Sequence, residues 1–415
     1  MTAVRSFRCP RCDARFGLEE QHFGCPRCAA EVGVDLEVEY DGRVAPSRTV
    51  AEGAPRGLWR WADSLPVPAS AAVSLGEGAT PLVALARLGA EIGLADLRGK
   101  NESVEPTWSF KDRLATVAIS WAKTRGIGGV ATSSSGNAGA AAAAYAAKAG
   151  LPCVVFTTRA FPGTMQRFMR SYGAMVVATP TAPDRWVLNR AVAGEWGWMA
   201  ISNVVDPPVG SHPIAIEGCK TIAYEIAEDL GWSAPDAVVI PVAYGDALSG
   251  IARGFSEMLA AGLVRKIPRL IAVEAYPTLS RALAENAEAP VRVDASGSRA
   301  YSVATPRGTW QALRAVRSSK GTAVAVSDEE ALAAQRDLRE REGLLLELSS
   351  AMPLAAVRRL VASGDLSRSD SVVLLLTSSG LKDLEVTDAG GELPLAEPRL
   401  DDLRRVLKES YGFAA

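Results

Sequence analysis

The sequence predicts an α/β protein with two open domains and a small cysteine-rich module at the N-terminus. The chain has 415 residues, more than one hydrophobic core usually organises. Three apolar segments with strand character each run into a turn of small residues, and helix-forming sequence follows two of these turns. Such units are typical of parallel sheets covered by helices. Four cysteines lie within the first 28 residues.

The composition is that of an ordinary globular protein, with 48% hydrophobic and 22% charged residues. A formal net charge of -2 offers no electrostatic attraction to nucleic acid or to an anionic membrane. Arg5, Arg8 and cysteines stand where a signal peptide would have an apolar segment, and no apolar run is long enough to span a bilayer. We therefore expect a cytoplasmic protein that binds neither nucleic acid nor a membrane.

The N-terminal module, residues 1–40, contains a candidate metal site. Two Cys-Pro-Arg-Cys motifs are separated by twelve residues, a spacing that can bring four thiolates to the corners of one tetrahedron. Two disulfides are the alternative, which a reducing compartment disfavours. A nucleic-acid-binding ribbon is disfavoured because acidic residues lie between the motifs. We predict a structural zinc ion with the ligands Cys9, Cys12, Cys25 and Cys28.

The first strand, turn and helix unit follows Gly129. Val130 to Thr132 is predicted as a strand, Ser133 to Asn137 as a turn, and Ala138 to Ala149 as a helix, because alanine has the highest helix propensity. Pro152 to Phe156 then resumes the sheet. A turn between a parallel strand and a helix presents free N–H groups that attract an anion. A simple helix cap is the alternative role of this turn.

Two further units have the same character. Ala237 to Val242 is predicted as a strand, and Leu248 to Ala261 as a helix that follows the small-residue loop 243–247. Such a loop can hold a phosphate group. Ser371 to Leu376 is apolar enough for a strand buried on both faces, and Thr377-Ser-Ser-Gly follows it. Val34 to Tyr40 alternates like a short strand.

The segment Pro106-Thr-Trp-Ser-Phe-Lys-Asp-Arg113 contains Lys111, a candidate for the lysine that holds pyridoxal phosphate as a Schiff base. A lone lysine is ordinarily a solvent-exposed residue of a helix. This one precedes the Ser-Ser-Ser-Gly-Asn turn, and Glu217-Gly-Cys-Lys-Thr lies further on. Together with Gly-Glu-Gly-Ala-Thr-Pro-Leu82, these motifs resemble the threonine synthase branch of the fold type II pyridoxal-phosphate enzymes.

The resemblance implies a homodimer with the cofactor in a cleft between two open α/β domains. Residues 41–115 and 217–400 would form the large domain, residues 116–216 a small inserted domain, and residues 401–415 a terminal helix. Lys111 would be the catalytic residue. The implied cofactor-binding residues are Phe110, Lys111, Asn137, Ala243, Tyr244, Gly245, Asp246, Ala247 and Thr377, and the implied substrate-binding residues are Ser134, Ser135 and Asn203.

Several positions depart from the family pattern. Trp108 replaces a glycine, Asp246-Ala247 replaces Gly-Asn in the phosphate loop, and Ala215 stands where many members have an arginine that binds the substrate phosphate. We expect a lyase that removes a Cγ or Cβ leaving group from O-phosphohomoserine or a related small amino acid, followed by water addition or replacement. The alternative is a serine/threonine dehydratase or β-replacement synthase with an unphosphorylated substrate. A non-catalytic docking module is disfavoured because Lys111 is present.

Overall fold

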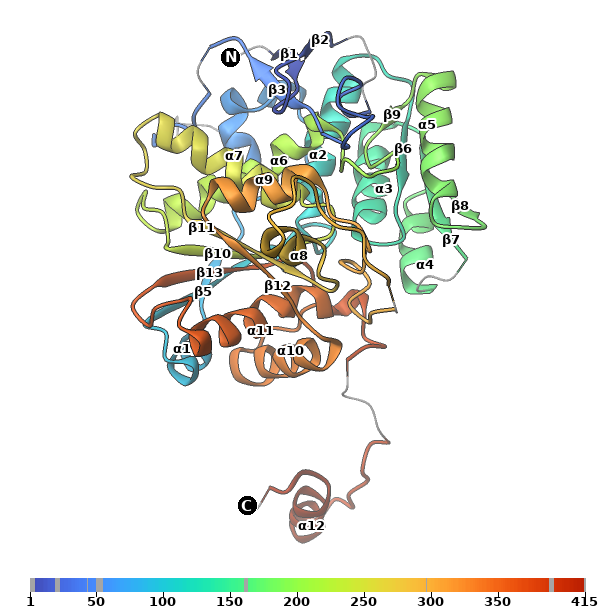
Figure 1. Ribbon diagram of the computed structural model, residues 1–415. Helices are drawn as coiled ribbons and strands as arrows, with labels where there is room; N and C mark the ends of the chain where they lie inside the picture. The colour runs from blue at the N-terminus through green and yellow to red at the C-terminus, as the bar shows by residue number, and fades with distance from the viewer. Residues whose placement is uncertain are drawn as a thin grey trace.

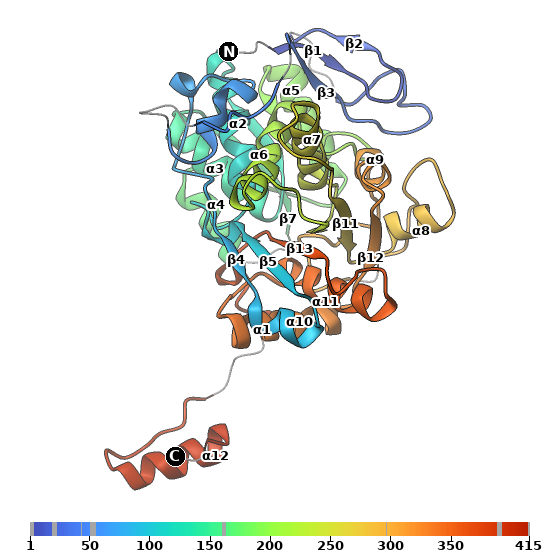
Figure 2. The same ribbon diagram turned by 90° about the vertical axis from the view of Figure 1, so that its left-hand side faces the viewer.

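The computed structural model describes residues 4–18, 23–42, 44–49, 55–159, 163–295, 297–387 and 392–413. It contains three sheets, and helices cover the two larger ones (Figures 1 and 2). The strands are β1 Val4–Arg8, β2 Arg15–Phe16, β3 Glu37–Tyr40, β4 Leu82–Ala84, β5 Asp96–Asn101, β6 Val130–Ser133, β7 Cys153–Thr158, β8 Met175–Thr179, β9 Met199–Ala200, β10 Ala237–Pro241, β11 Arg269–Glu274, β12 Thr322–Ala325 and β13 Ser371–Leu376. The helices are α1 Ala86–Ile92, α2 Lys111–Thr124, α3 Asn137–Ala149, α4 Gly163–Ser171, α5 Asp184–Trp196, α6 Pro213–Asp229, α7 Asp246–Ala260, α8 Thr278–Ala284, α9 Trp310–Ser318, α10 Asp328–Glu342, α11 Leu348–Ser363 and α12 Leu400–Tyr411.

The largest sheet has six strands in the order β12-β11-β10-β13-β5-β4, and only β4 is antiparallel to its neighbour. Successive side chains of a strand point to opposite faces. In β10, Val239 therefore joins a core with α1, α10 and α11, while Val238 joins a second core with α6, α7 and α9. Both faces are apolar because both are covered by helices (Figure 1).

The second sheet has four parallel strands in the order β8-β7-β6-β9, and α3, α4 and α5 pack against it. All its strands lie between residues 130 and 200. The expected limits of the inserted segment, residues 116 and 216, fall inside α2 and α6. Contacts of α2 with both α3 and α6 join the regions around the two sheets.

The N-terminal module forms the antiparallel sheet β2-β1-β3 and packs on the larger body, with residues 19–22 outside the described part. The Tyr40 hydroxyl donates to Glu217 at 2.5 Å, and Arg253 donates to the Val38 carbonyl. The expected strand from Val34 begins only at Glu37. Before it, the Asp35 carboxylate accepts the Leu36 N–H instead of leaving this group for the ladder.

Two other expected ends also differ. The α7 helix begins at Asp246, two residues before the expected start, because Gly245 takes a left-handed conformation that sets the first turn. The terminal helix α12 ends at Tyr411, where Gly412 is left-handed. In both views α12 lies apart from the sheets (Figures 1 and 2). Within the described ranges, no helix has the length and apolar character needed to cross a membrane.

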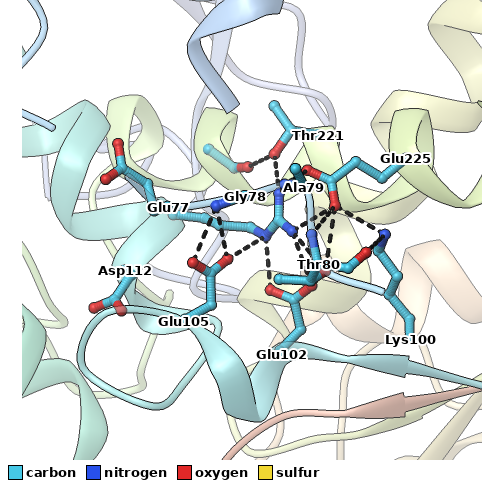
Figure 3. Close-up of polar contacts among 12 residues, drawn as sticks. Glu77, Gly78, Ala79, Thr80, Lys100, Glu102, Glu105, Asp112, Thr221 and Glu225 are labelled. Carbon is cyan, nitrogen blue, oxygen red and sulfur yellow. Dashed lines mark hydrogen bonds and ion pairs between the residues drawn. The ribbon is translucent and has the colours of Figure 1, made fainter. Parts of the chain in front are cut away.

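A fully buried guanidinium, Arg113, fixes the first turn of α2. Its Nε lies 2.7 Å from Glu102 and 3.2 Å from Glu105, and its Nη1 lies 2.8 Å from Glu225. Figure 3 shows these three carboxylates gathered around one point, with Lys100 beside Glu225. Burial alone would raise the pKa of Glu225, but Arg113 and Lys100 bring it below its ordinary value. These residues form the Arg113 network, which joins β5, α2 and α6.

Arg113→Met should lower the free energy of unfolding by about 3–5 kcal/mol, because three buried carboxylates lose their counter-charge. The measurement is the shift in the urea unfolding midpoint. Lys123→Met changes the same charge at an exposed position of the same helix and should stay within about 0.5 kcal/mol of wild type. Equal shifts in the two variants would contradict a dominant role for the network.

The burial of Asp112 predicts that the stability of the protein depends on pH. Asp112 accepts hydrogen bonds from the N–H and the hydroxyl of Thr107 at 2.6 and 2.5 Å, yet burial raises its pKa to about 7. Because the folded pKa lies above the unfolded value, protonated Asp112 stabilises the folded state. This stabilisation is fully present below about pH 4 and is lost as the pH rises through 7. Relative to Asp112→Asn, the wild-type unfolding free energy should therefore fall by about 1 kcal/mol or more between pH 4 and 7. A pH-independent difference would contradict the shift.

Candidate active site

A cavity of about 400 Å³ lies where three strands of the two larger sheets end. The turn after β6, the loop after β10 and the residue after β13 all contribute to its wall. The carboxyl ends of parallel strands meet at one edge of a sheet, which explains the convergence. The structure brings all the sequence-predicted cofactor and substrate residues to this cavity: Phe110, Lys111, Ser134, Ser135, Asn137, Asn203, Ala243, Tyr244, Gly245, Asp246, Ala247 and Thr377.

Lys111 is the first residue of α2, and the end of β13 holds it in place. The Phe110 N–H donates to the Thr377 carbonyl at 3.0 Å. The Lys111 ammonium lies 4.5 Å from the centre of the Phe110 ring and 3.5 Å from the Asp246 carboxylate. Its side chain is 20% exposed, so the amine can be reached from the cavity.

The backbone just before Lys111 is held in an unusual conformation. Trp108 has a φ of 61°, in the left-handed region that favours glycine. The Ser379 N–H and the Ser378 hydroxyl donate to the Trp108 carbonyl at 3.0 and 3.1 Å. The indole stacks on Phe168 of α4 at 5.5 Å. The tryptophan that replaces the family glycine thus keeps the glycine-like backbone and adds a contact to the second sheet's helices.

Three hydrogen bonds orient the Asn137 amide. Its nitrogen donates to Glu347 at 2.7 Å, and its oxygen accepts from Lys382 at 2.7 Å and from the Ser378 hydroxyl at 3.3 Å. Burial lowers the pKa of Lys382 to about 8, although Glu347 acts to raise it. Sequence reasoning missed Glu347 and Lys382, because neither belongs to a small-residue turn that marks an anion site.

The turn after β6 leaves the amino end of α3 open. The N-cap is Gly136, and no side chain of the described residues caps this end, so the helix-cap role of the turn is wrong. The Ser134 hydroxyl accepts the Gly136 N–H at 3.2 Å. The Ser135 hydroxyl lies 2.9 Å from Thr157 and accepts a hydrogen bond from Arg185 at 3.2 Å.

Asn203 lines the cavity, but its amide is used within its own loop. The oxygen accepts the N–H groups of Val209 and Gly210 at 2.9 and 3.4 Å, and the nitrogen donates to the Val205 carbonyl at 2.7 Å. Ala215, in place of the family arginine, is fully buried inside α6. The position of the arginine therefore supplies no charge here.

The loop after β10 leads into the open amino end of α7. Gly245 has a φ of 82°, and a Cβ there would lie 2.5 Å from the Ala312 Cβ, so only glycine fits. Among the described residues, no side chain caps α7. The Asp246 carboxylate turns toward Ser211, whose hydroxyl and N–H donate at 2.6 and 3.1 Å, and toward Lys111. The two hydrogen bonds from Ser211 and the positive charge of Lys111 offset the negative charge of Asp246 near the amino end of α7.

These residues fit pyridoxal phosphate. Lys111 supplies an amine for the aldehyde, and the open end of α7 supplies N–H groups for a phosphate. The Thr377 hydroxyl lies 2.7 Å from the Ser350 hydroxyl and is a neutral hydrogen-bonding group on the wall of the same cavity. The Asp246 carboxylate, which would repel a phosphate, accepts two hydrogen bonds from Ser211 and lies beside the Lys111 ammonium.

The N-terminal cysteines form a separate cluster. Their sulfur atoms all lie within 4.8 Å of one another, with Cys9 to Cys28 at 3.8 Å and Cys12 to Cys25 at 3.6 Å. A tetrahedron with metal–sulfur bonds of about 2.3 Å has edges of about 3.8 Å. A disulfide needs about 2.05 Å, so these pairs are not bonded to each other. The donor set fits zinc. Cys153 and Cys219 are both buried.

Comparison with known proteins identifies the family. Residues 73–378 match the model of the family described as pyridoxal-phosphate dependent enzyme. The chain is 32% identical to the threonine synthase of Methanocaldococcus jannaschii, over 97% of this chain and 99% of the relative. It is 34% identical to the threonine synthase of Methanosarcina acetivorans, over 84% and 86%.

Solved structures share the fold. Maize serine racemase matches with a TM-score of 0.63 and 21% identity, over 72% of this chain and 88% of that one. The processed form of threonine deaminase isoform 2 from Solanum lycopersicum matches with a TM-score of 0.62 and 20% identity, over 80% and 83%. The chain therefore belongs to the threonine synthase-like family of fold type II pyridoxal-phosphate-dependent lyases.

Proposed function

We propose that this enzyme converts O-phosphohomoserine, or a closely related amino acid with an anionic leaving group, to threonine by elimination and water addition. The observation that carries the proposal is the convergence of the Lys111 amine and two open helix ends, α3 and α7, on one cavity. Threonine synthases that align with nearly the whole chain support the choice of substrate.

In this mechanism each part of the cavity has one role. Pyridoxal phosphate, when bound, stabilises negative charge at the substrate Cα. Lys111 would hold the cofactor through its amine and would move the proton at the substrate Cα. The open end of α3, with Ser134 and Ser135, binds the substrate carboxylate. Asn137, fixed by Glu347, orients the cofactor ring.

The neutral Thr377 hydroxyl has a chemical consequence. In the proposed site it would hydrogen-bond the ring nitrogen of the cofactor, and its present partner is another hydroxyl, that of Ser350. A neutral partner does not enforce protonation of that nitrogen as a carboxylate would. This favours elimination and replacement over transamination.

We further propose that the cysteine cluster holds one structural zinc ion, and that the enzyme is a cytoplasmic homodimer. The matching tetrahedral edges support the metal. The family supports the dimer.

Incubation of the holoenzyme with O-phosphohomoserine should release threonine and phosphate in equal amounts, because one leaving group departs for each water added. Formation of 2-oxobutyrate from threonine, without threonine release, would identify a dehydratase instead. In Lys111→Ala the turnover number should fall by at least about 10³-fold, because both the attachment and the proton transfer are lost. Borohydride reduction should label wild type at Lys111 and leave this position unlabelled in the variant. Lys148→Ala, an exposed lysine on α3, is the control.

Purified protein should contain one zinc ion per chain, and the double variant Cys9→Ser/Cys25→Ser should contain none. A module of about 40 residues has too small a core to hold its structure alone, so metal loss should open it to proteolysis. Metal analysis and limited proteolysis with and without a chelator measure both effects. Cys153→Ser, outside the module, should keep its zinc. Stoichiometric zinc in the double variant would contradict the assignment.

A further inference from the structure

Two basic side chains of the described residues line the cavity, Lys111 and Arg185. Of the two, only Lys111 has a carboxylate of the described residues close to its positive charge. Lys111 has the Asp246 carboxylate at 3.5 Å. In the described part of the chain, no carboxylate lies within 4.0 Å of the Arg185 guanidinium, whereas the buried Arg113 has three. The Arg185 Nη1 donates to the Ser135 hydroxyl at 3.2 Å, and its Nε donates to the Ala182 carbonyl at 3.0 Å.

Arg185 stands in the first turn of α5, on the wall formed by the second sheet. It is half-buried, and burial lowers its pKa, but a guanidinium remains charged at every physiological pH. The next residue, Trp186, meets the Tyr244 ring edge to face at 6.4 Å, which keeps this turn of α5 close to the loop after β10. A desolvated cation with free N–H groups and no counter-charge favours an anion in the cavity.

Three anionic groups enter the proposed site: the cofactor phosphate, the substrate carboxylate and the leaving group. The open amino end of α7 is available to the first, and the open amino end of α3 to the second. The amino end of α5, whose first turn carries Arg185, also reaches the cavity and is available to the third group, the leaving group. Its phosphate matches the planar fork of a guanidinium, which can donate two parallel hydrogen bonds.

We infer that Arg185 binds the anionic group on the substrate side chain and makes the enzyme prefer anionic over neutral amino acids of the same length. This inference rests on the proposed function. The recognised chemistry is an oxyanion such as a phosphate ester at Cγ. Arg185 is a specificity-determining residue, and Ser135 positions it through the hydrogen bond to Nη1.

The test compares Arg185→Gln with Arg190→Gln in the holoenzyme. Arg190 lies on the same helix, is exposed, and contacts the Phe23 ring at 5.4 Å. Arg190→Gln therefore removes the same charge from the same helix without changing the cavity. Initial rates give the KM for O-phosphohomoserine, or calorimetry its dissociation constant where no threonine forms. Calorimetry gives the dissociation constants for L-homoserine and inorganic phosphate, and the cofactor content is measured for each variant. Arg185→Gln should weaken O-phosphohomoserine and phosphate about 10- to 100-fold, as expected for a charge-assisted hydrogen bond. L-Homoserine should change less than about threefold, and Arg190→Gln should match wild type.

The other outcomes overturn the inference. Equal weakening of both amino acids would place the substrate carboxylate at Arg185, and loss of bound cofactor would place the cofactor phosphate there. Unchanged binding in Arg185→Gln would mean that no anion is held. Arg185→Lys keeps the positive charge but loses the planar pair of N–H donors, so its affinity for O-phosphohomoserine should lie between those of wild type and Arg185→Gln. Because it keeps a long basic side chain, it also controls for a folding defect in Arg185→Gln. If O-phosphohomoserine binds through Arg185 but no threonine forms, the proposed function fails and the inference stands.

Discussion

The position of the Lys111 amine depends on one buried cation, Arg113. Arg113 is completely enclosed and is balanced by Glu102 and Glu105, which follow β5, and by Glu225 of α6. A buried charge is tolerated only when its partners stay in place, so this network resists relative movement of β5, α2 and α6. Lys111 lies two residues earlier on the same helix turn. The Arg113 network (Figure 3) therefore holds the helix turn that carries Lys111, and Arg113 and its three carboxylates do not line the cavity.

Around that fixed amine, the cavity is polarised by backbone as much as by side chains. Neither α3 nor α7 has a side-chain cap among the described residues, so the amino ends of both helices present free N–H groups to the cavity. The departures from the family pattern fit into this arrangement. Asp246 is compensated by Ser211 and Lys111, and Trp108 keeps the left-handed backbone of the glycine it replaces.

The N-terminal module packs against a loop that lines the cavity, although its cysteine cluster lies outside the cavity. A Cβ at Gly33 would lie 3.1 Å from the Pro207 carbonyl, and one at Gly24 would lie 2.9 Å from the Val209 side chain. The module therefore packs against the loop that Asn203 closes by hydrogen bonds to its own backbone. The ring of Phe7 meets His212, which caps α6 at the end of this loop. Folding of the module and the shape of one cavity wall are thereby linked.

The sequence alone determined several of the strands and turns and made Lys111 a candidate, because periodicity, small residues and local motifs act over a few neighbouring positions. The strand Ser371–Leu376 has its predicted limits, and residues 133–137 and 243–247 of the predicted turns line the cavity together with Thr377. Only the tertiary structure decided the partners of those residues. Lys382 and Glu347 orient Asn137 from more than 200 positions away, and Arg185 reaches Ser135 from a helix with no motif of its own. Hydrogen bonds and charge balance join atoms that folding brings together, and no local pattern records which distant side chain will compensate a buried charge.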